Sequence, residues 1–160
     1  MKRHARVQRP KALFAPMQVD DIDAVVSIEL DSFTMPWTAA MFRSELQNER
    51  TSRLLVARMP HKGDIIVGYL AYRIVLDEMH IILLAVAPAW RQQGIARQML
   101  GVGIGEARDA GCLRATLEVR VSNTPAQQLY YGLQFAPVGT RPKYYMQPTE
   151  DAMILWRDPL

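Results

Sequence analysis

The first part of the chain carries a helical pattern that follows a short extended segment at 14–18. Apolar residues recur there three or four positions apart, which is the spacing of one face of a helix beginning after a cap at Asp20. These apolar positions are Ile22, Val25, Val26, Leu30 and Phe33. Pro36 interrupts the pattern, and Thr38 is a suitable cap for a second, short helix that ends near Gln47.

The middle of the chain changes to patterns typical of strands. Residues 54–58, 65–75 and 79–86 are rich in β-branched and other apolar residues, and polar turns separate them. The last two segments predict an antiparallel hairpin. A helical pattern follows over 94–110, and alternation of apolar and polar residues then predicts a strand over 112–121.

A strand, a helix and a strand in this order predict parallel strands joined by a right-handed crossover. The positions of the second strand that we expect to face the core are Leu113, Ala115, Leu117, Val119 and Val121. Thr124 is predicted to cap a further helix with Pro125 at its first position. Strand-like segments at 138–146 and 152–156 close the chain. The fold class predicted is α/β, or α+β, with a mixed central sheet flanked by helices.

Length and composition act mainly by excluding classes of protein. The 160 residues are 49% hydrophobic and 22% charged, which is ordinary for one globular domain with its own core. The longest apolar run, 81–90, is shorter than the roughly 20 residues of a membrane span. Cys112 is the only cysteine, and no zinc or calcium spacing is present, so we expect no disulfide, no bound metal and no membrane association.

The charge divides the chain into a basic arm and a mildly acidic body. The net charge is +3, but five of the 19 Lys and Arg lie within residues 1–11, which hold no Asp or Glu. Residues 12–160 therefore carry 14 basic against 16 acidic side chains, a net charge of −2. We expect a mobile, solvated arm at 1–11 that binds no nucleic acid, and a single domain at 12–160. The arm lacks the apolar stretch of a secretory signal, which favours a cytoplasmic protein.

The segment 84–97 is the most informative for function. A buried strand ends at Pro88, and a loop with small residues at Gly94 and Ala96 leads into a helix. Backbone N–H groups of such a loop, with the positive end of the helix dipole, suit a pyrophosphate. An ordinary strand-to-helix turn has the same local pattern, so this segment alone leaves both interpretations open.

Three further glycines, Gly101, Gly103 and Gly105, fall in the middle of the same predicted helix. A dinucleotide-binding glycine motif directly follows a strand, so these residues do not form one. Each interior glycine costs roughly 0.8 to 1 kcal/mol relative to alanine. The sequence assigns them no role.

Glu118 and Tyr130 are candidates for acid–base chemistry. Glu118 lies on the polar face near the end of a parallel strand, where open sheets commonly build their sites, and Tyr130 follows on the next helix. Each has a structural alternative: Glu118 as a surface partner of a neighbouring arginine, and Tyr130 as an aromatic residue of the core. His80 is interpreted as a structural strand residue, because nothing in the sequence pairs it with Cys112 or Glu78.

Several segments together resemble GNAT N-acetyltransferases, and among them the bacterial ribosomal-protein-alanine N-acetyltransferases. The similarity runs from about residue 16 to 157. The matching segments are M-P-W-T at 35–38, V-L-D-E at 75–78, L-A-V at 84–86, R-Q-Q-G-I-A at 91–96, L-E-V-R-V-S-N at 117–123, L-Y at 129–130, Y-Y at 144–145 and D-A-M-I at 151–154. The chain departs from the family at Leu83, at Gln134 and in the extra glycines of its central helix.

The resemblance implies the GNAT fold and direct transfer of an acetyl group from acetyl-CoA to an amine in a ternary complex, with Glu118 as base and Tyr130 as acid. The residues that it implies for acetyl-CoA are Leu84, Ala85, Val86, Gln92, Gln93, Gly94, Ile95, Ala96, Arg97 and Asn123. A backbone N–H near Val86 would stabilise the oxyanion. The family's acceptor is the N-terminal alanine of the eighteenth small-subunit ribosomal protein, whose start is basic.

The acceptor side implied by the resemblance comprises the first helices, Trp37, the turn at 77–78 and the tyrosines at 144–145. Several acidic residues there favour a cationic peptide. Another protein N terminus, a lysine or a small-molecule amine stays open as acceptor. A CoA-binding module without catalysis is a further alternative, and the presence of both Glu118 and Tyr130 argues against it.

Overall fold

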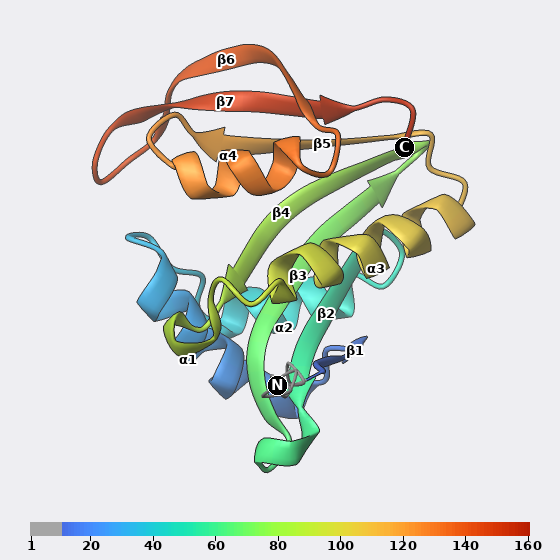
Figure 1. Cartoon of the computed structure of the whole chain (residues 1–160), viewed down its shortest axis with the longest axis vertical. Coiled ribbons are helices and arrows are strands. Elements are labelled where there is room, and N and C mark those ends of the chain that lie inside the picture. The colour runs from blue at the N-terminus through green and yellow to red at the C-terminus, as the bar shows by residue number, and fades with distance from the viewer. Residues whose placement is uncertain (1–10) are drawn as a thin grey trace, which may run out of the picture.

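The structure is a computed structural model that describes residues 11–160. Seven strands form one mixed sheet in the order β1-β2-β3-β4-β5-β7-β6, flanked by four helices (Figure 1). The strands are β1 (Leu13–Pro16), β2 (Ser52–Met59), β3 (Ile65–Val75), β4 (Glu78–Val86), β5 (Arg114–Arg120), β6 (Ala136–Tyr145) and β7 (Glu150–Arg157). The helices are α1 (Ile22–Ser32), α2 (Ala39–Gln47), α3 (Ile95–Asp109) and α4 (Thr124–Tyr131). The predicted mixed α/β architecture is confirmed.

The arm predicted at 1–11 lies outside the described residues except for Lys11. Within 11–160, none of the helices combines the length and the apolar character that crossing a membrane requires.

The N-terminal half of the sheet, β1 to β4, is antiparallel and is covered on both faces. Side chains of β2 alternate between two cores, because successive residues of a strand point to opposite faces. Leu55 and Ala57 belong to the core beneath α3, whereas Leu54 and Val56 belong to the core beneath α1 and α2. This half is therefore a three-layered structure, with α3 on one side of the strands and α1 and α2 on the other (Figure 1).

Close packing of α3 on the sheet explains one of the three mid-helix glycines. A Cβ atom at Gly103 would lie 2.8 Å from a methyl group of Leu70 on β3, so only glycine fits without movement. Gly101 and Gly105 face open space, and nothing in their surroundings requires glycine.

The two halves of the sheet meet at a short parallel junction between β4 and β5. Only three residue pairs join these strands: Glu78 with Arg114, Met79 with Ala115, and His80 with Thr116. Beyond His80 the strands diverge and the sheet opens into a fork (Figure 1). The predicted parallel crossover through α3 is thus confirmed, and the fork leaves residues 81–86 of β4 without a strand partner on the β5 side.

The C-terminal half consists of β5, β7 and β6, paired antiparallel, with α4 packed against one face. Leu117 and Val119 of β5 point into that core as predicted. Leu113 and Val121, predicted to join them, lie just outside the strand and are 63% and 47% exposed. The alternation therefore holds only within β5 itself.

Two predicted helix caps are wrong by one residue. A short turn over Val19–Asp21 precedes α1, and the Asp21 carboxylate accepts from the Gln18 N–H at 2.8 Å, so Asp20 is not the cap. At α4 the cap is Asn123, whose side-chain oxygen accepts from the Ala126 N–H at 3.2 Å, rather than Thr124. The Thr38 cap of α2 is confirmed by its bond from the Met41 N–H at 3.3 Å.

The buried face of α1 also differs from the predicted one. Leu30 and Phe33 are 63% and 38% exposed, whereas Ile28 and Glu29 are buried. The helix therefore turns a carboxylate into the core beneath α1, which the apolar spacing did not predict.

Candidate active site

A cavity of about 660 Å³ lies at the fork between the two halves of the sheet. One wall comes from the end of β4 and the start of α3, and the other from α4. The residues that line it are Ser32, Phe33, Leu84, Ala85, Val86, Trp90, Arg91, Gln92, Gly94, Ile95, Ala96, Arg97, Asn123, Pro125, Ala126, Leu129 and Tyr130.

The N-terminus of α3 provides an anion-binding element in this wall. Gly94 precedes the helix with a φ of +81°, a left-handed conformation that glycine adopts without strain. The N–H of Gln98 is bonded to the Gly94 carbonyl at 3.1 Å, so the N–H groups of the preceding first turn have no partner within the helix. These groups and the positive end of the helix dipole suit a phosphate.

Nine of the ten residues predicted to hold acetyl-CoA line this one cavity. The exception is Gln93, whose side chain donates to the Ala89 carbonyl at 3.4 Å. The structure thus brings together two parts of the chain that are separate in sequence, the segment 84–97 and Asn123. The side-chain oxygen of Asn123 is already used as the helix cap, so the amide nitrogen is its remaining donor.

Sequence reasoning missed the residues that hold the cavity walls in place. Arg91 donates from Nε to the Val86 carbonyl at 2.9 Å and from Nη2 to the Ser32 hydroxyl at 3.1 Å. It therefore connects the end of β4 to the end of α1. Arg91 falls within the R-Q-Q-G-I-A segment, which was a signal for its importance but not for this role.

Tyr130 lies on the α4 wall of the cavity and is 7% exposed. Its ring packs edge-on against Phe135, with the ring centroids 5.8 Å apart. Burial, with a smaller contribution from Tyr145, raises the pKa of the Tyr130 hydroxyl above its ordinary value. The hydroxyl therefore keeps its proton at neutral pH and is able to donate it.

Glu118 lies on β5 with its side chain only 11% exposed. One carboxylate oxygen, Oε2, is 2.8 Å from Nε2 of His80, and the other, Oε1, is 3.5 Å from Nε of Arg141. The hydrogen bond with His80 is the largest cause that lowers the pKa of Glu118, and Arg141 lowers it further against the opposing effect of burial. Glu118 is consequently an ionised carboxylate at neutral pH, and it is not among the residues that line the 660 Å³ cavity.

The β4–β5 junction brings His80 to Glu118, a partner that was not predicted from the sequence. His80 pairs with Thr116 in the last register position before the strands diverge. Glu118 is two residues farther along β5, on the same face as Thr116, so its side chain reaches back to the imidazole. The 38 residues between the two and the α3 crossover hid this contact from sequence reasoning.

Two tyrosines at the end of β6 lie near Glu118. Burial raises the pKa of Tyr145 to about 12, and burial also raises the pKa of Tyr144, with Glu118 contributing in both cases. The guanidinium of Arg120 lies 4.4 Å from the centre of the Tyr145 ring and donates to the backbone beyond it. The predicted acceptor-side segment at 144–145 is therefore next to the candidate base.

The acidic turn predicted to attract a cationic acceptor is already paired. Nη2 of Arg114 lies 2.8 Å from an oxygen of Glu78 and 3.7 Å from one of Asp77. This pairing compensates much of the negative charge of the turn, which weakens the electrostatic argument for a basic acceptor peptide.

Trp37, another residue predicted for the acceptor side, is held from within the fold. Its backbone N–H donates to Oε1 of Glu29 at 2.8 Å, and the other oxygen of Glu29 accepts from the Tyr69 hydroxyl. Its ring packs against Phe42, with the centroids 5.4 Å apart. The buried Glu29 thus attaches the segment after α1 to both the helix and β3.

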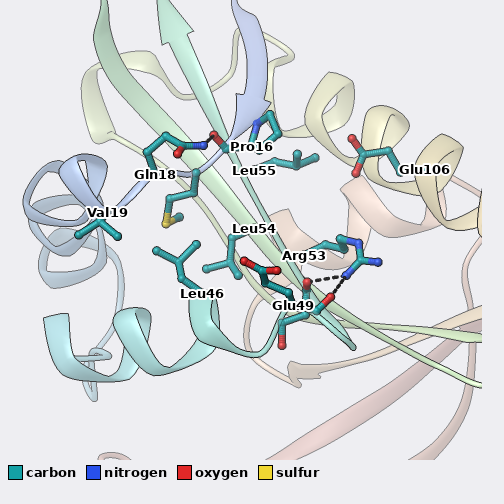
Figure 2. A pocket seen from close by; sticks show the side chains of 11 residues that line it. Pro16, Gln18, Val19, Leu46, Glu49, Arg53, Leu54, Leu55 and Glu106 are labelled. Carbon is teal, nitrogen blue, oxygen red and sulfur yellow. Dashed lines mark hydrogen bonds between the residues drawn. The ribbon is translucent and has the colours of Figure 1, made fainter.

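A second cavity, of about 610 Å³, lies beside β1 and β2. Figure 2 shows the side chains of its wall, with Arg53 bonded to backbone carbonyls beside Glu49. None of the residues predicted to hold acetyl-CoA or to act as acid or base lines it. Across residues 11–160 we also found no group of three or more His, Cys, Asp and Glu side chains that could hold a metal ion.

The fold and the cavity at the fork agree with those expected of an acetyltransferase, and comparison with protein families identifies the same class. The chain belongs to the Acetyltransferase (GNAT) family, whose family model matches residues 22–135. This range runs from the start of α1 to the residue after the α4 turn, and it includes Glu118, Tyr130 and the N-terminus of α3.

Two relatives of this chain are named for one particular acetyltransferase activity. A protein of Bacillus subtilis (strain 168) is 36% identical over 149 residues, covering 92% of this chain and 96% of the relative; its name assigns it provisionally as a ribosomal protein bS18-alanine N-acetyltransferase. The ribosomal protein bS18-alanine N-acetyltransferase of Escherichia coli (strain K12) is 33% identical over 143 residues, covering 87% of this chain and 92% of the relative.

Solved structures agree on the fold. The crystal structure of the ribosomal-protein-S18-alanine N-acetyltransferase from Escherichia coli has a TM-score of 0.83 and 29% identity, covering 93% of this chain and 94% of that one. Arabidopsis thaliana NAA60 in complex with acetyl-CoA has a TM-score of 0.84 at 18% identity, covering 92% of this chain and 98% of that one, which shows the shared fold alone.

Proposed function

We propose that this protein transfers an acetyl group from acetyl-CoA to the α-amine of the N-terminal alanine of ribosomal protein bS18. The observation that carries this proposal is the similarity to relatives named for that activity, at 36% and 33% identity over 92% and 87% of this chain. Such full-length similarity covers both the donor cavity and the β5–α4 region that holds Glu118 and Tyr130.

The cavity at the fork is the proposed donor site. Acetyl-CoA, when bound, supplies the thioester from which the acetyl group is transferred. The unpartnered N–H groups at the start of α3 suit its pyrophosphate, and the apolar walls from Leu84 to Val86 and from Leu129 suit its less polar arm. The backbone N–H near Val86 remains the proposed donor to the reacting carbonyl oxygen.

Glu118 is the proposed proton acceptor for the amine. An α-amine has an ordinary pKa of about 7.7 to 8.0, so freeing it at pH 7 costs only about 1 kcal/mol, whereas a lysine with a pKa of about 10.4 costs about 4.6 kcal/mol. A single ionised carboxylate, acting directly or through a water molecule, suffices for the first case. The lowered pKa of Glu118 ensures that the carboxylate is ready to accept.

Tyr130 is the proposed general acid. Its hydroxyl keeps its proton at neutral pH because burial raises its pKa, and its side chain is part of the donor cavity. There it can give a proton to the departing sulfur, provided that the two lie within about 3 Å.

The enzyme would act on bS18 either on the ribosome or before ribosome assembly, so the proposal includes a cytoplasmic location. It also includes a basic N-terminal peptide as the partner. The paired state of Asp77 and Glu78 gives peptide charge a modest role. Changing the charge of residues that follow the alanine is thus expected to alter KM less than blocking the amine does.

Mass spectrometry of acetylated peptides tests the proposal. Three synthetic peptides share one sequence that begins with Ala followed by aromatic and basic residues: free, N-terminally blocked, and blocked with an added lysine. The expected result is one acetyl group on the α-nitrogen of the free peptide. Comparable labelling of either blocked peptide would overturn the α-amine assignment, and labelling confined to the peptide with the added lysine would favour a lysine acceptor.

A further inference from the structure

We infer that His80 is a positioning residue for Glu118, and that it holds oxygen Oε2 so that Oε1 is the atom that accepts the proton of the acceptor amine. This inference rests on the proposed function, because it assigns the use of the same carboxylate.

The contact itself has the geometry of a charge-assisted hydrogen bond, with Nε2 of His80 and Oε2 of Glu118 2.8 Å apart. An ionised carboxylate can only accept, so Nε2 must carry the hydrogen in this bond. The bond has this direction in the neutral imidazole, where Nδ1 then bears the lone pair, and equally in the imidazolium, where both ring nitrogens carry hydrogen. Oε2 is thereby occupied, and its partner oxygen is left for the substrate.

The setting of His80 does not match that of a residue kept for packing. Its side chain is 42% exposed. Nε2 to Glu118 is the one side-chain hydrogen bond that the imidazole makes within residues 11–160. The fold gains little from burying this ring, so its main interaction is the one with the carboxylate.

Arg141 contacts the same carboxylate but is a weaker partner. Its guanidinium is 55% exposed and lies 3.5 Å from Oε1, beyond the usual length of a charge-assisted hydrogen bond. A substrate amine can displace or share this exposed contact more readily than the 2.8 Å contact from His80.

The other polar groups around Glu118 leave His80 as the main determinant of its ionisation. From β6, Arg141 faces it with the hydroxyl-bearing Tyr144 and Tyr145. On β4, His80 itself is the only such contact given by the described structure, and Arg73, opposite His80 on β3, is bound to Glu45 at 2.6 and 2.7 Å. Loss of His80 is therefore expected to raise the pH at which Glu118 titrates.

The experiment compares His80→Leu and His80→Gln with the wild-type enzyme, with Arg141→Gln as matched control. The dependence of kcat/KM on pH is recorded with the free alanine peptide. We expect His80→Leu to lose roughly ten- to a hundredfold in kcat with little change in KM, and its acidic limb to move to higher pH. His80→Gln keeps an N–H donor and should recover most of kcat, while its acidic limb still moves up because the amide is neutral. Arg141→Gln should move the limb less than either.

A purely structural role predicts a different outcome: altered melting temperatures with an unchanged pH profile. That result in both His80 variants would overturn the inference. If His80→Leu does not fold, the pH profile of His80→Gln alone tests the inference. A shift of its acidic limb to higher pH supports the positioning role of His80, and an unchanged limb contradicts it. Glu118→Gln keeps the two proposals separate: full activity in it contradicts Glu118 as base, whereas an inactive Glu118→Gln beside an unchanged His80 profile refutes only the role of His80.

Discussion

Two glutamates, one in each half of the molecule, are nearly hidden from solvent, and yet their pKa values are shifted in opposite directions. Glu29 on α1 is 1% exposed, and burial raises its pKa to about 7. Glu118 on β5, with its side chain 11% exposed, has a lowered pKa because of His80 first and Arg141 second. Their partners explain the difference, since the hydrogen-bond donors to the Glu29 side chain within residues 11–160 are the Trp37 N–H and the Tyr69 hydroxyl, both neutral.

Burial penalises both carboxylates, so the sign of the shift depends on what each one meets after desolvation. The N-terminal half encloses its carboxylate between a helix and the sheet and uses it to hold the segment at Trp37. In the C-terminal half, the residues of β5 that point away from the core are half-buried, and Glu118 among them has His80 and Arg141 as partners. The buried carboxylate of the N-terminal half is thus suited to stabilising the fold, and that of the C-terminal half stays ionised and is suited to proton transfer.

The largest expected effect separates the two glutamates by function. Replacing Glu118 with Gln removes the proposed proton acceptor and should lower kcat/KM by about 10²- to 10⁴-fold. Glu29→Gln keeps an acceptor for the Trp37 N–H and should change kcat/KM by less than about tenfold. Steady-state kinetics on the free alanine peptide measures both, with thermal unfolding to show that each variant is folded. Equal losses in the two variants would contradict the division of roles.

The next largest effect is the pH dependence of stability that Glu29 produces. Its pKa in the folded protein is raised from 4.5 to about 7, so the stability it contributes is fully present below pH 4.5 and lost as pH rises through about 7. The free energy of unfolding of the wild type should therefore fall relative to that of Glu29→Gln between pH 5 and 8, by up to about 3 kcal/mol. Urea unfolding at several pH values measures it.

Glu118 should give the pH dependence of the free energy of unfolding the opposite sign. Its lowered pKa means that its stabilising contribution is present above pH 4.5 and lost as pH falls through the lower folded value. Relative to Glu118→Gln, the wild type should thus lose stability on acidification rather than on alkalinisation. The same slope in both pairs of proteins would show that the partners of Glu118 do not offset its burial.

Sequence patterns predicted the order of the elements because each of them depends on local periodicity. The resemblance to GNAT N-acetyltransferases, rather than periodicity, implied nine residues of the cavity wall, which belong to segments around the start of α3 and the start of α4. Local sequence patterns did not predict contacts between segments that are distant in the chain. The register of β4 against β5, which brings His80 to Glu118, is set by the α3 crossover and by only three residue pairs.

The buried carboxylate of Glu29 shows a second reason for failure. Apolar spacing predicts that Leu30 and Phe33 face the core, but the structure exposes both and buries Glu29 between Trp37 and Tyr69. A polar residue that is satisfied by tertiary hydrogen bonds carries no signal in a hydrophobic pattern. Its role can be found only once both partners have been placed.

Adding a methyl group to α3 tests how tightly the N-terminal half is packed. Gly103→Ala would bring Cβ to 2.8 Å from Leu70, so we expect a loss of about 1 to 3 kcal/mol in the free energy of unfolding. Gly105→Ala is the matched control, because it faces open space in the same helix and should gain about 0.5 to 1 kcal/mol. Denaturant unfolding of both variants gives the difference. A stabilising Gly103→Ala would mean that α3 moves freely on the sheet.

The smallest predicted effect concerns the C-terminal half, where α4 is only eight residues long and depends on its cap. Asn123→Ala removes the acceptor for the Ala126 N–H and should cost about 1 kcal/mol, whereas Thr124→Ala should be close to neutral. Asn123→Ser keeps a capping oxygen and should retain most of the stability. A higher KM for acetyl-CoA that persists in Asn123→Ser would then report a direct contact with the donor, because the position of α4 is preserved. If Thr124→Ala is the more destabilising change, the cap lies at the residue that the sequence pattern predicted, and α4 begins one residue later.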